Sequence, residues 1–108
     1  MLQVVTRFRL ADDDVAFRDE AAFAVAVLAR QDGYLDGSVA RCVDDPHLWV
    51  VETRWSSVGD FRRALSTFDV KVSVVPLLSR AVDEPSAFEV LHRHDAQGPV
   101  DSASDRAG

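Results

Sequence analysis

Cysteine, lysine and long apolar runs are scarce in this chain of 108 residues, and each shortage excludes a class of function. The only cysteine is Cys42, which rules out an intramolecular disulfide and a cysteine-based zinc cluster. No apolar run approaches the roughly 18 residues that span a bilayer, so we expect no membrane partner. The only lysine is Lys71, and a net charge of −6 disfavours nucleic acid as a partner, because phosphate binding needs a basic surface.

The length predicts a single domain. The first residues lack a basic segment followed by an apolar core, and we therefore predict a cytoplasmic protein. Apolar periodicity stops near residue 93. The expected organisation is a folded domain over residues 1–93 and a flexible tail over residues 94–108, where Gly, Pro, Ser, Asp and Ala dominate.

Hydrophobic periodicity defines the expected elements. Alternation predicts strands over residues 2–10, 34–43, 48–55 and 87–93, with an irregularity at Asp36 and Gly37. Helical spacing predicts a helix over residues 15–31, capped within residues 11–14, and a second from Ser56 or Ser57 to Thr67. An additional short helix over residues 69–80 is expected to kink at Pro76.

The order is βαββαβ, with the extra short helix before the last strand. It predicts the α+β, ferredoxin-like fold, in which helices cover one face of an antiparallel sheet with strand order 4-1-3-2. Parity places a set of charged residues on the other face, where they would form either solvated cross-strand pairs or the interface of a homodimer. We favour the interface, whose candidate residues are Arg7, Arg9, Glu52, Arg54 and Glu89.

The helix-covered face is where a small-molecule pocket would form. Its candidate residues come from the first and third strands, the two later helices and the end of the last strand: Thr6, Phe8, Trp49, Val51, Thr53, Trp55, Phe61, Phe68 and His92. Each aromatic among them has an alternative role as core. His92 and His94 share a strand face at a metal-like spacing, but no third ligand is evident, so we expect no metal site.

Several short motifs occur in a specific order: Gly33-Tyr34, Asp45-Pro46, Trp55-Ser56-Ser57 followed by Phe61, and Pro76-Leu77-Leu78. In this order, and over nearly all of residues 2–92, the chain resembles the antibiotic biosynthesis monooxygenase family. The resemblance implies a dimeric α+β barrel. It also implies oxidation of an aromatic phenol by dioxygen with no cofactor.

The resemblance further implies three substrate contacts: a polar side chain on the third strand, an aromatic at Trp55 and a tyrosine on the second helix. The chain keeps Trp55 but has Val51 where an amide is expected and Phe61 where the tyrosine is expected. Haem-degrading relatives need a histidine, a tryptophan and an asparagine. The corresponding places here are residues 69–76, which contain no histidine, Ala64 and Thr6, so haem degradation is not expected.

Two functions therefore remain. One is a cofactor-independent monooxygenase, or a related oxidoreductase, acting on a small aromatic or quinone-like molecule, with Thr6, Thr53 and His92 as polar partners. The other is a non-catalytic dimer that binds an apolar metabolite in the same pocket. Converging polar groups around a shared void would favour the enzyme, whereas a filled core would exclude both.

Overall fold

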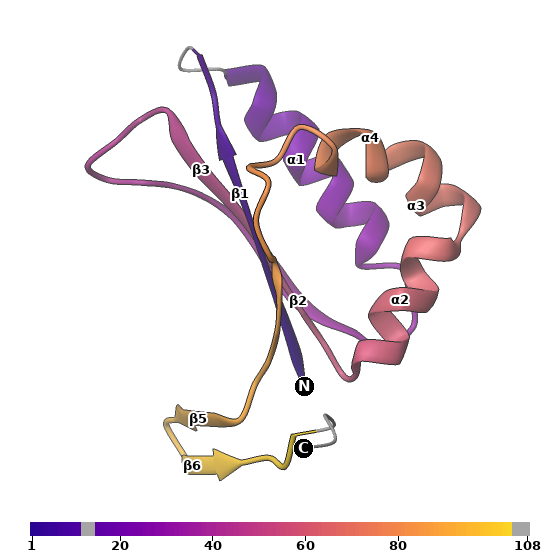
Figure 1. The fold of residues 1–108 in the computed structure, drawn as a ribbon, viewed down its shortest axis with the longest axis vertical. Helices are drawn as coiled ribbons and strands as arrows, with labels where there is room; N and C mark the ends of the chain where they lie inside the picture. The colour runs from indigo at the N-terminus through magenta and orange to yellow at the C-terminus, as the bar shows by residue number, and fades with distance from the viewer. Residues whose placement is uncertain (12–14, 105–108) are drawn as a thin grey trace.

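The computed structural model describes residues 1–11 and 15–104, so the cap predicted within residues 11–14 lies largely outside the described residues. The helices all cover one face of the main sheet (Figure 1). In chain order the elements are β1 (Leu2–Arg9), α1 (Val15–Leu28), β2 (Tyr34–Arg41), β3 (Leu48–Trp55), α2 (Val58–Ser66), α3 (Phe68–Ser73), α4 (Val75–Leu78), β4 (Ala87–Glu89), β5 (His92–Asp95) and β6 (Gly98–Asp101).

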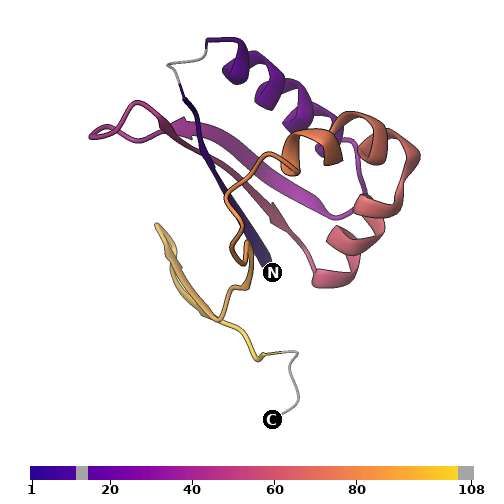
Figure 2. The ribbon, with the colours of Figure 1, turned by 45° about the horizontal axis from the view of Figure 1, so that its top comes forward.

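The main sheet has four strands in the order β2-β3-β1-β4, and every neighbouring pair is antiparallel. This arrangement confirms the predicted ferredoxin-like α+β fold. Turning the molecule shows that the helices form one layer and the sheet the other, with the β5–β6 hairpin beyond the helix-free side (Figure 2). Within the described residues, no helix is long and apolar enough to cross a membrane.

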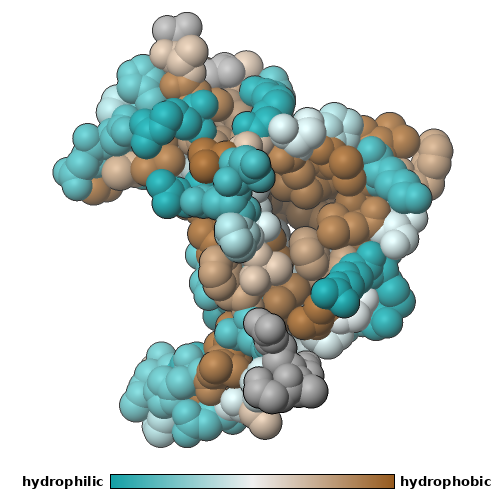
Figure 3. Space-filling view, viewed as in Figure 1, coloured by the Kyte–Doolittle hydropathy of each residue, from teal (hydrophilic) through white to brown (hydrophobic). Residues whose placement is uncertain are grey.

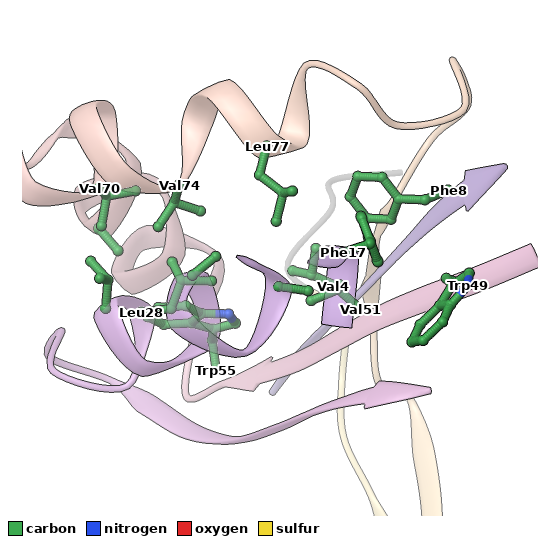
Figure 4. Packing of buried hydrophobic residues seen from close by; sticks show 14 of the residues in the cluster. Val4, Phe8, Phe17, Leu28, Trp49, Val51, Trp55, Val70, Val74 and Leu77 are labelled. Atoms are coloured by element: carbon green, nitrogen blue, oxygen red, sulfur yellow. The ribbon is translucent and has the colours of Figure 1, made fainter. Parts of the chain in front are cut away.

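Alternation along β1 and β3 builds the core. Every second residue of each strand is buried, and direct pairing such as Thr6 with Val51 keeps the buried set on one face. The helices contribute the opposing apolar side chains, as Figure 4 shows for Phe17 and Leu28 of α1 and Val70 of α3. Burial of this interleaved apolar surface is the main force that holds the two layers together.

A glycine controls the entry into β2. Gly33 has a φ of +84°, a left-handed conformation that suits glycine, and a Cβ there would lie only 2.4 Å from the side chain of Asp60. The strand then shifts register between Tyr34 and Asp36, which confirms the irregularity expected from the sequence. Gly33 therefore allows the start of α2 to pack directly against the start of β2.

Proline divides the segment after α2 into two short helices. α3 ends at Ser73 and α4 begins at Val75, so the break precedes Pro76, which lies in the first turn of α4. Proline lacks an N–H and fits the first turn of a helix, where that group has no intrahelical partner. The predicted kink is therefore present as a change of helix.

The last predicted strand is shorter than expected. β4 ends at Glu89, beside the first residues of β1, and one further backbone bond joins Val90 to Met1 at 2.9 Å. The chain then leaves the sheet and forms the separate hairpin of β5 and β6. The boundary predicted between residues 93 and 94 falls within β5. Residues 105–108 of the expected tail lie outside the described residues.

The helix-free face carries the predicted charges with one correction. Glu89 pairs with Leu2, whose side chain is on the helix side, so the register places Glu89 on that side and Phe88 on the other. Sequence parity failed here because the start of the last strand was assigned without knowledge of its register. Arg7, Arg9, Glu52 and Arg54 do have the parity of the helix-free face.

The cations of this face pair differently from the predicted ladder. Arg54 Nε donates to Asp36 Oδ1 of the neighbouring strand at 2.8 Å, and Arg9 reaches Asp45 at 2.9 Å. Glu52 instead accepts from the Gln3 amide at 3.0 Å. Exposed pairs of this kind contribute little to stability, so they fix orientation more than they stabilise the fold.

Candidate functional site

A cavity of about 430 Å³ lies at the partly uncovered edge of β1, next to α2 and α4. We call it the β1-edge cavity. It is walled by β1, by Phe61 and Leu65 of α2, by Leu78 of α4 and by much of the segment 79–86. Figure 3 shows hydrophobic surface gathered around a hollow between the helices and the segment that leads to β4. The volume falls in the range of small-molecule sites, roughly 300–1,000 Å³.

The cavity exists because β4 is short. Beyond Val4 the neighbouring chain contacts β1 through two separated backbone bonds, from Val5 N to Ser86 O at 2.7 Å and from Val82 N to Arg7 O at 2.8 Å. The residues between these bonds bulge away from the strand. An opening therefore remains where a longer β4 would have continued the sheet.

Thr6 is the predicted polar residue that the structure places at this cavity. Its side chain is 8% exposed, lines the cavity and has no hydrogen-bond partner among the described residues. Within the described residues, the fully buried side-chain polar atoms without a partner are His47 Nδ1 and Trp49 Nε1, so the Thr6 oxygen is accessible and can bond water or a ligand. Thr6 is therefore available to hold a polar atom of a bound molecule.

Trp55 and Thr53 are engaged with each other. The indole Nε1 of Trp55 donates to Thr53 Oγ1 at 2.9 Å, and both side chains are buried. The rings of Tyr34 and Phe61 pack against Trp55 with centroid distances of 5.4 and 5.5 Å. The structure corrects the expectation that Trp55 and Thr53 face a pocket, because their polar atoms satisfy each other inside the core.

Three further predicted pocket residues also belong to the core. Phe8 packs against Phe17 with a centroid distance of 5.0 Å, and Phe17 meets Trp49 edge-on at 5.5 Å. Val51 is buried among them at 4% exposure (Figure 4). Phe8, Phe17 and Trp49 fill the space under α1, so the predicted pocket is occupied by side chains there, whereas the β1-edge cavity is open.

Two predicted site residues lie elsewhere. Phe68 begins α3 and is 78% exposed, because the helix turns this position towards solvent. His92 starts β5, where its ring contacts Asp101 at 2.5 Å and meets the His94 ring edge-on at a centroid distance of 5.8 Å. Within the described residues, no group of three or more His, Cys, Asp or Glu side chains is arranged to hold a metal ion.

Phe61 is the predicted residue that joins the two regions. One side of its ring packs on Trp55, and the side chain also lines the β1-edge cavity. Its position follows from the start of α2, where Ser57 Oγ accepts from Asp60 N at 3.1 Å as the helix cap. Ser56 and Arg63 also hydrogen-bond the Asp60 carboxylate and hold its pKa below the usual range.

The sequence did not identify the segment 79–86 as part of the site. Residues 83–85 read as a turn, and nothing in the alternation of β1 showed that its edge would be left partly uncovered. The available signal was the pair of carboxylates, Asp83 and Glu84, immediately before Pro85 and a strand that pairs with β1. Both carboxylates line the cavity.

Tyr34 and Asp36 of β2 have different electrostatic environments. Burial, and secondarily the charge of Asp36, raises the pKa of Tyr34. Hydrogen bonding from Arg54 lowers the pKa of Asp36. The Tyr34 hydroxyl lies where a Cβ on Gly37 would come within 2.5 Å of it, so this glycine makes room for the ring.

Comparison with solved structures gives the same architecture. SnoaB, a cofactor-independent oxygenase from Streptomyces nogalater, was crystallised as a point variant that is 25% identical, with a TM-score of 0.72 over 82% of this chain and 91% of that one. Another crystal structure of SnoaB is 24% identical, with a TM-score of 0.72 over 88% and 95%. A conserved protein from Methanosarcina mazei Go1 is 18% identical, with a TM-score of 0.66 over 81% and 89%.

The comparison by sequence is narrower. No functionally curated protein matches the chain significantly. The family model described as antibiotic biosynthesis monooxygenase matches residues 1–74, which include β1, Thr6, Trp55, Phe61 and Leu65. The match covers more than half of the chain and includes the part of the β1-edge cavity formed by β1 and α2. The chain therefore belongs to the antibiotic biosynthesis monooxygenase family.

Proposed function

We propose that the protein is a cofactor-independent monooxygenase that oxidises a small aromatic molecule with dioxygen in the β1-edge cavity. The observation that carries this proposal is a cavity of about 430 Å³ that is lined by apolar side chains of α2 and α4, by Thr6 of β1 and by charged residues of the neighbouring segment. Membership of the family and the likeness to SnoaB, a cofactor-independent oxygenase, support the reaction class.

The walls of the cavity favour a flat, apolar substrate. Phe61, Leu65 and Leu78 approach it from the helices, and the Phe61 ring is already held against Trp55. A ring placed there would bury apolar surface, while Thr6 bonds an oxygen atom of the substrate. Thr6 on β1 thereby supplies a hydrogen-bond donor for the substrate, which Val51 on β3 and Phe61 on α2 cannot supply.

Dioxygen uptake with a panel of anthrones and hydroquinones tests the proposal. Leu65→Trp would fill the cavity from α2 and is expected to lower uptake at least about tenfold, because the substrate no longer fits. Ala22→Trp is the matched control, since Ala22 lines a separate hollow of about 370 Å³ beside Trp49. The control should retain the wild-type rate.

The proposal would be contradicted if, with every compound of the panel, the wild type took up no more dioxygen than an unrelated folded protein. Equal loss in both tryptophan variants would also contradict it, because the activity would then not depend on this cavity. Circular dichroism and thermal melting of each variant separate loss of activity from loss of folding.

A non-catalytic binding protein for an apolar metabolite is the alternative function. It is favoured by the absence of polar groups at Val51 and Phe61. In that case quinones should raise the melting temperature of the wild type but not of Leu65→Trp, and no panel compound should be oxidised. Binding without uptake would select this alternative.

We also propose that two copies pair through their helix-free sheet faces. This face exposes a shallow apolar hollow of about 200 Å³ on which Val5, Ala40 and Val50 meet, flanked by Arg7. Apolar surface with a charged rim is typical of protein interfaces. Light scattering should give twice the monomer mass at micromolar concentration, and Val50→Asp should give the monomer mass; a monomeric wild type would contradict the pairing.

A further inference from the structure

An ion pair stands at the β1-edge cavity opposite its apolar end. Arg7 Nε lies 3.5 Å from Glu84 Oε1, and both residues line the cavity. The two backbone bonds that join residues 82 and 86 to β1 hold the intervening segment in place. Glu84 is therefore held in two ways: by the backbone bonds on either side of it and by the guanidinium of Arg7 on β1.

The remaining polar groups of the cavity leave few candidates for proton transfer. The Ser79 hydroxyl donates to Pro76 O at 2.7 Å and is already engaged. Thr6 is a hydroxyl and a poor proton acceptor at neutral pH. The carboxylates that line the cavity are Asp83 and Glu84, and of these Glu84 is the one that a described cation holds.

We propose that Glu84 is the proton acceptor for the substrate in this cavity and that Arg7 is the residue that positions it. The inference rests on the proposed function. It names the group that would ionise an aromatic substrate with an acidic methylene or hydroxyl group before the substrate reacts with dioxygen. Such a molecule would place its ring between Phe61, Leu65 and Leu78 and its acidic end towards Glu84.

The chemistry balances with dioxygen as the only oxidant. For an anthrone, Glu84 takes one methylene proton, the C–H electron pair stays on the substrate as an enolate, and this anion adds dioxygen to form a peroxide. The protonated Glu84 returns its proton to the peroxide oxygen. Loss of the second methylene proton to Glu84 breaks the O–O bond, leaves a ketone and releases hydroxide, which recovers the proton as water.

Charge at the site is consistent with this cycle. Arg7 keeps a positive charge next to the carboxylate and stabilises the anion that forms when the substrate loses its proton. Asp83 is the other charged side chain of the wall. Its negative charge would oppose a second anion, so the position of Arg7 determines which end of the cavity holds the substrate's acidic group.

Anaerobic deuterium exchange separates this inference from the oxygenase reaction. With dithranol, a dihydroxyanthrone, in deuterated buffer under argon, the wild type should speed exchange of the methylene hydrogens above the buffer rate, as followed by NMR. Glu84→Gln should lower the enzyme-dependent rate by on the order of 100-fold, the usual effect of losing a general base.

The matched control is Glu20→Gln. Glu20 also forms a surface pair with an arginine, Arg80, at 2.7 Å, but it lies on α1 away from the cavity. This variant should exchange at the wild-type rate. Arg7→Gln should slow exchange about tenfold, and Arg7→Lys should recover part of the rate, which a purely structural role of Arg7 in folding would not predict.

Each outcome decides between the two proposals. Exchange that depends on Glu84 without any dioxygen uptake would support the proton acceptor and refute the oxygenase. Exchange by the wild type that survives in Glu84→Gln, or that is lost in Asp83→Asn alone, would overturn the assignment of Glu84. No wild-type exchange above buffer would overturn it too, whatever the oxygen electrode records.

Discussion

Thr6 and Thr53 lie on neighbouring strands, on the same face of one sheet, and they are the two buried polar side chains of the described residues. Thr53 accepts the indole N–H of Trp55, whereas Thr6 lines the β1-edge cavity. The difference shows that the helix-covered face has two halves. Over β3 it is filled and builds the fold; beside β1 it is open and available to a ligand.

The largest effect is expected in the filled half. Trp55→Ala should lower the free energy of unfolding by about 3–5 kcal/mol, because it leaves a large cavity between Tyr34 and Phe61. Urea denaturation followed by circular dichroism measures the change. A loss below about 1 kcal/mol would show that Trp55 belongs to a loosely packed site and would abolish the distinction between the halves.

Thr53→Val tests the same half with a change of nearly constant volume. The variant leaves the buried Nε1 of Trp55 without its acceptor and should cost about 1–3 kcal/mol in the free energy of unfolding. Oxygen uptake per folded molecule should be unchanged. If uptake fell while stability stayed constant, Thr53 would be a substrate contact after all.

Thr6→Val is the matched change in the open half and should give the opposite result. The hydroxyl has no partner to lose, so the free energy of unfolding should change by less than about 0.5 kcal/mol, as for substitutions away from such contacts. Ligand affinity or kcat/KM should fall about fivefold to tenfold, the value of one hydrogen bond of about 1 kcal/mol. A stable variant with unchanged kcat/KM would show that the substrate does not reach Thr6.

The sequence predicts the filled half well because its signals are local. Alternation in β1 and β3 identifies the buried face, and Ser57 caps α2 where expected. These features depend on residues close together in the chain. They also decide which strands can pair, and the strand order follows from the βαββαβ pattern.

The open half depends on how β4 pairs with β1, two segments that are far apart in the sequence. Local sequence patterns do not reveal that pairing. The length and register of β4 determine that Glu89 faces the helices and that residues 83–85 bulge beside β1. The same register removes His92 from the sheet. Of the nine predicted pocket residues only Thr6 and Phe61 line the β1-edge cavity. Most of the large aromatic side chains pack against one another in the core instead.

The smallest effect concerns the start of α2, which places Phe61 between the two halves. Hydrogen bonds from Ser56 and Arg63 lower the pKa of Asp60, so its stabilisation is complete above the unfolded value near pH 4 and is lost as the pH falls through the lowered pKa. Asp60→Asn should therefore lower the melting temperature at pH 7, with a difference that shrinks towards pH 2. Asp69→Asn, a first-turn carboxylate of α3, is the control. If the difference for Asp60→Asn stayed constant across this pH range, the Asp60 side chain would act through its shape and not through its charge.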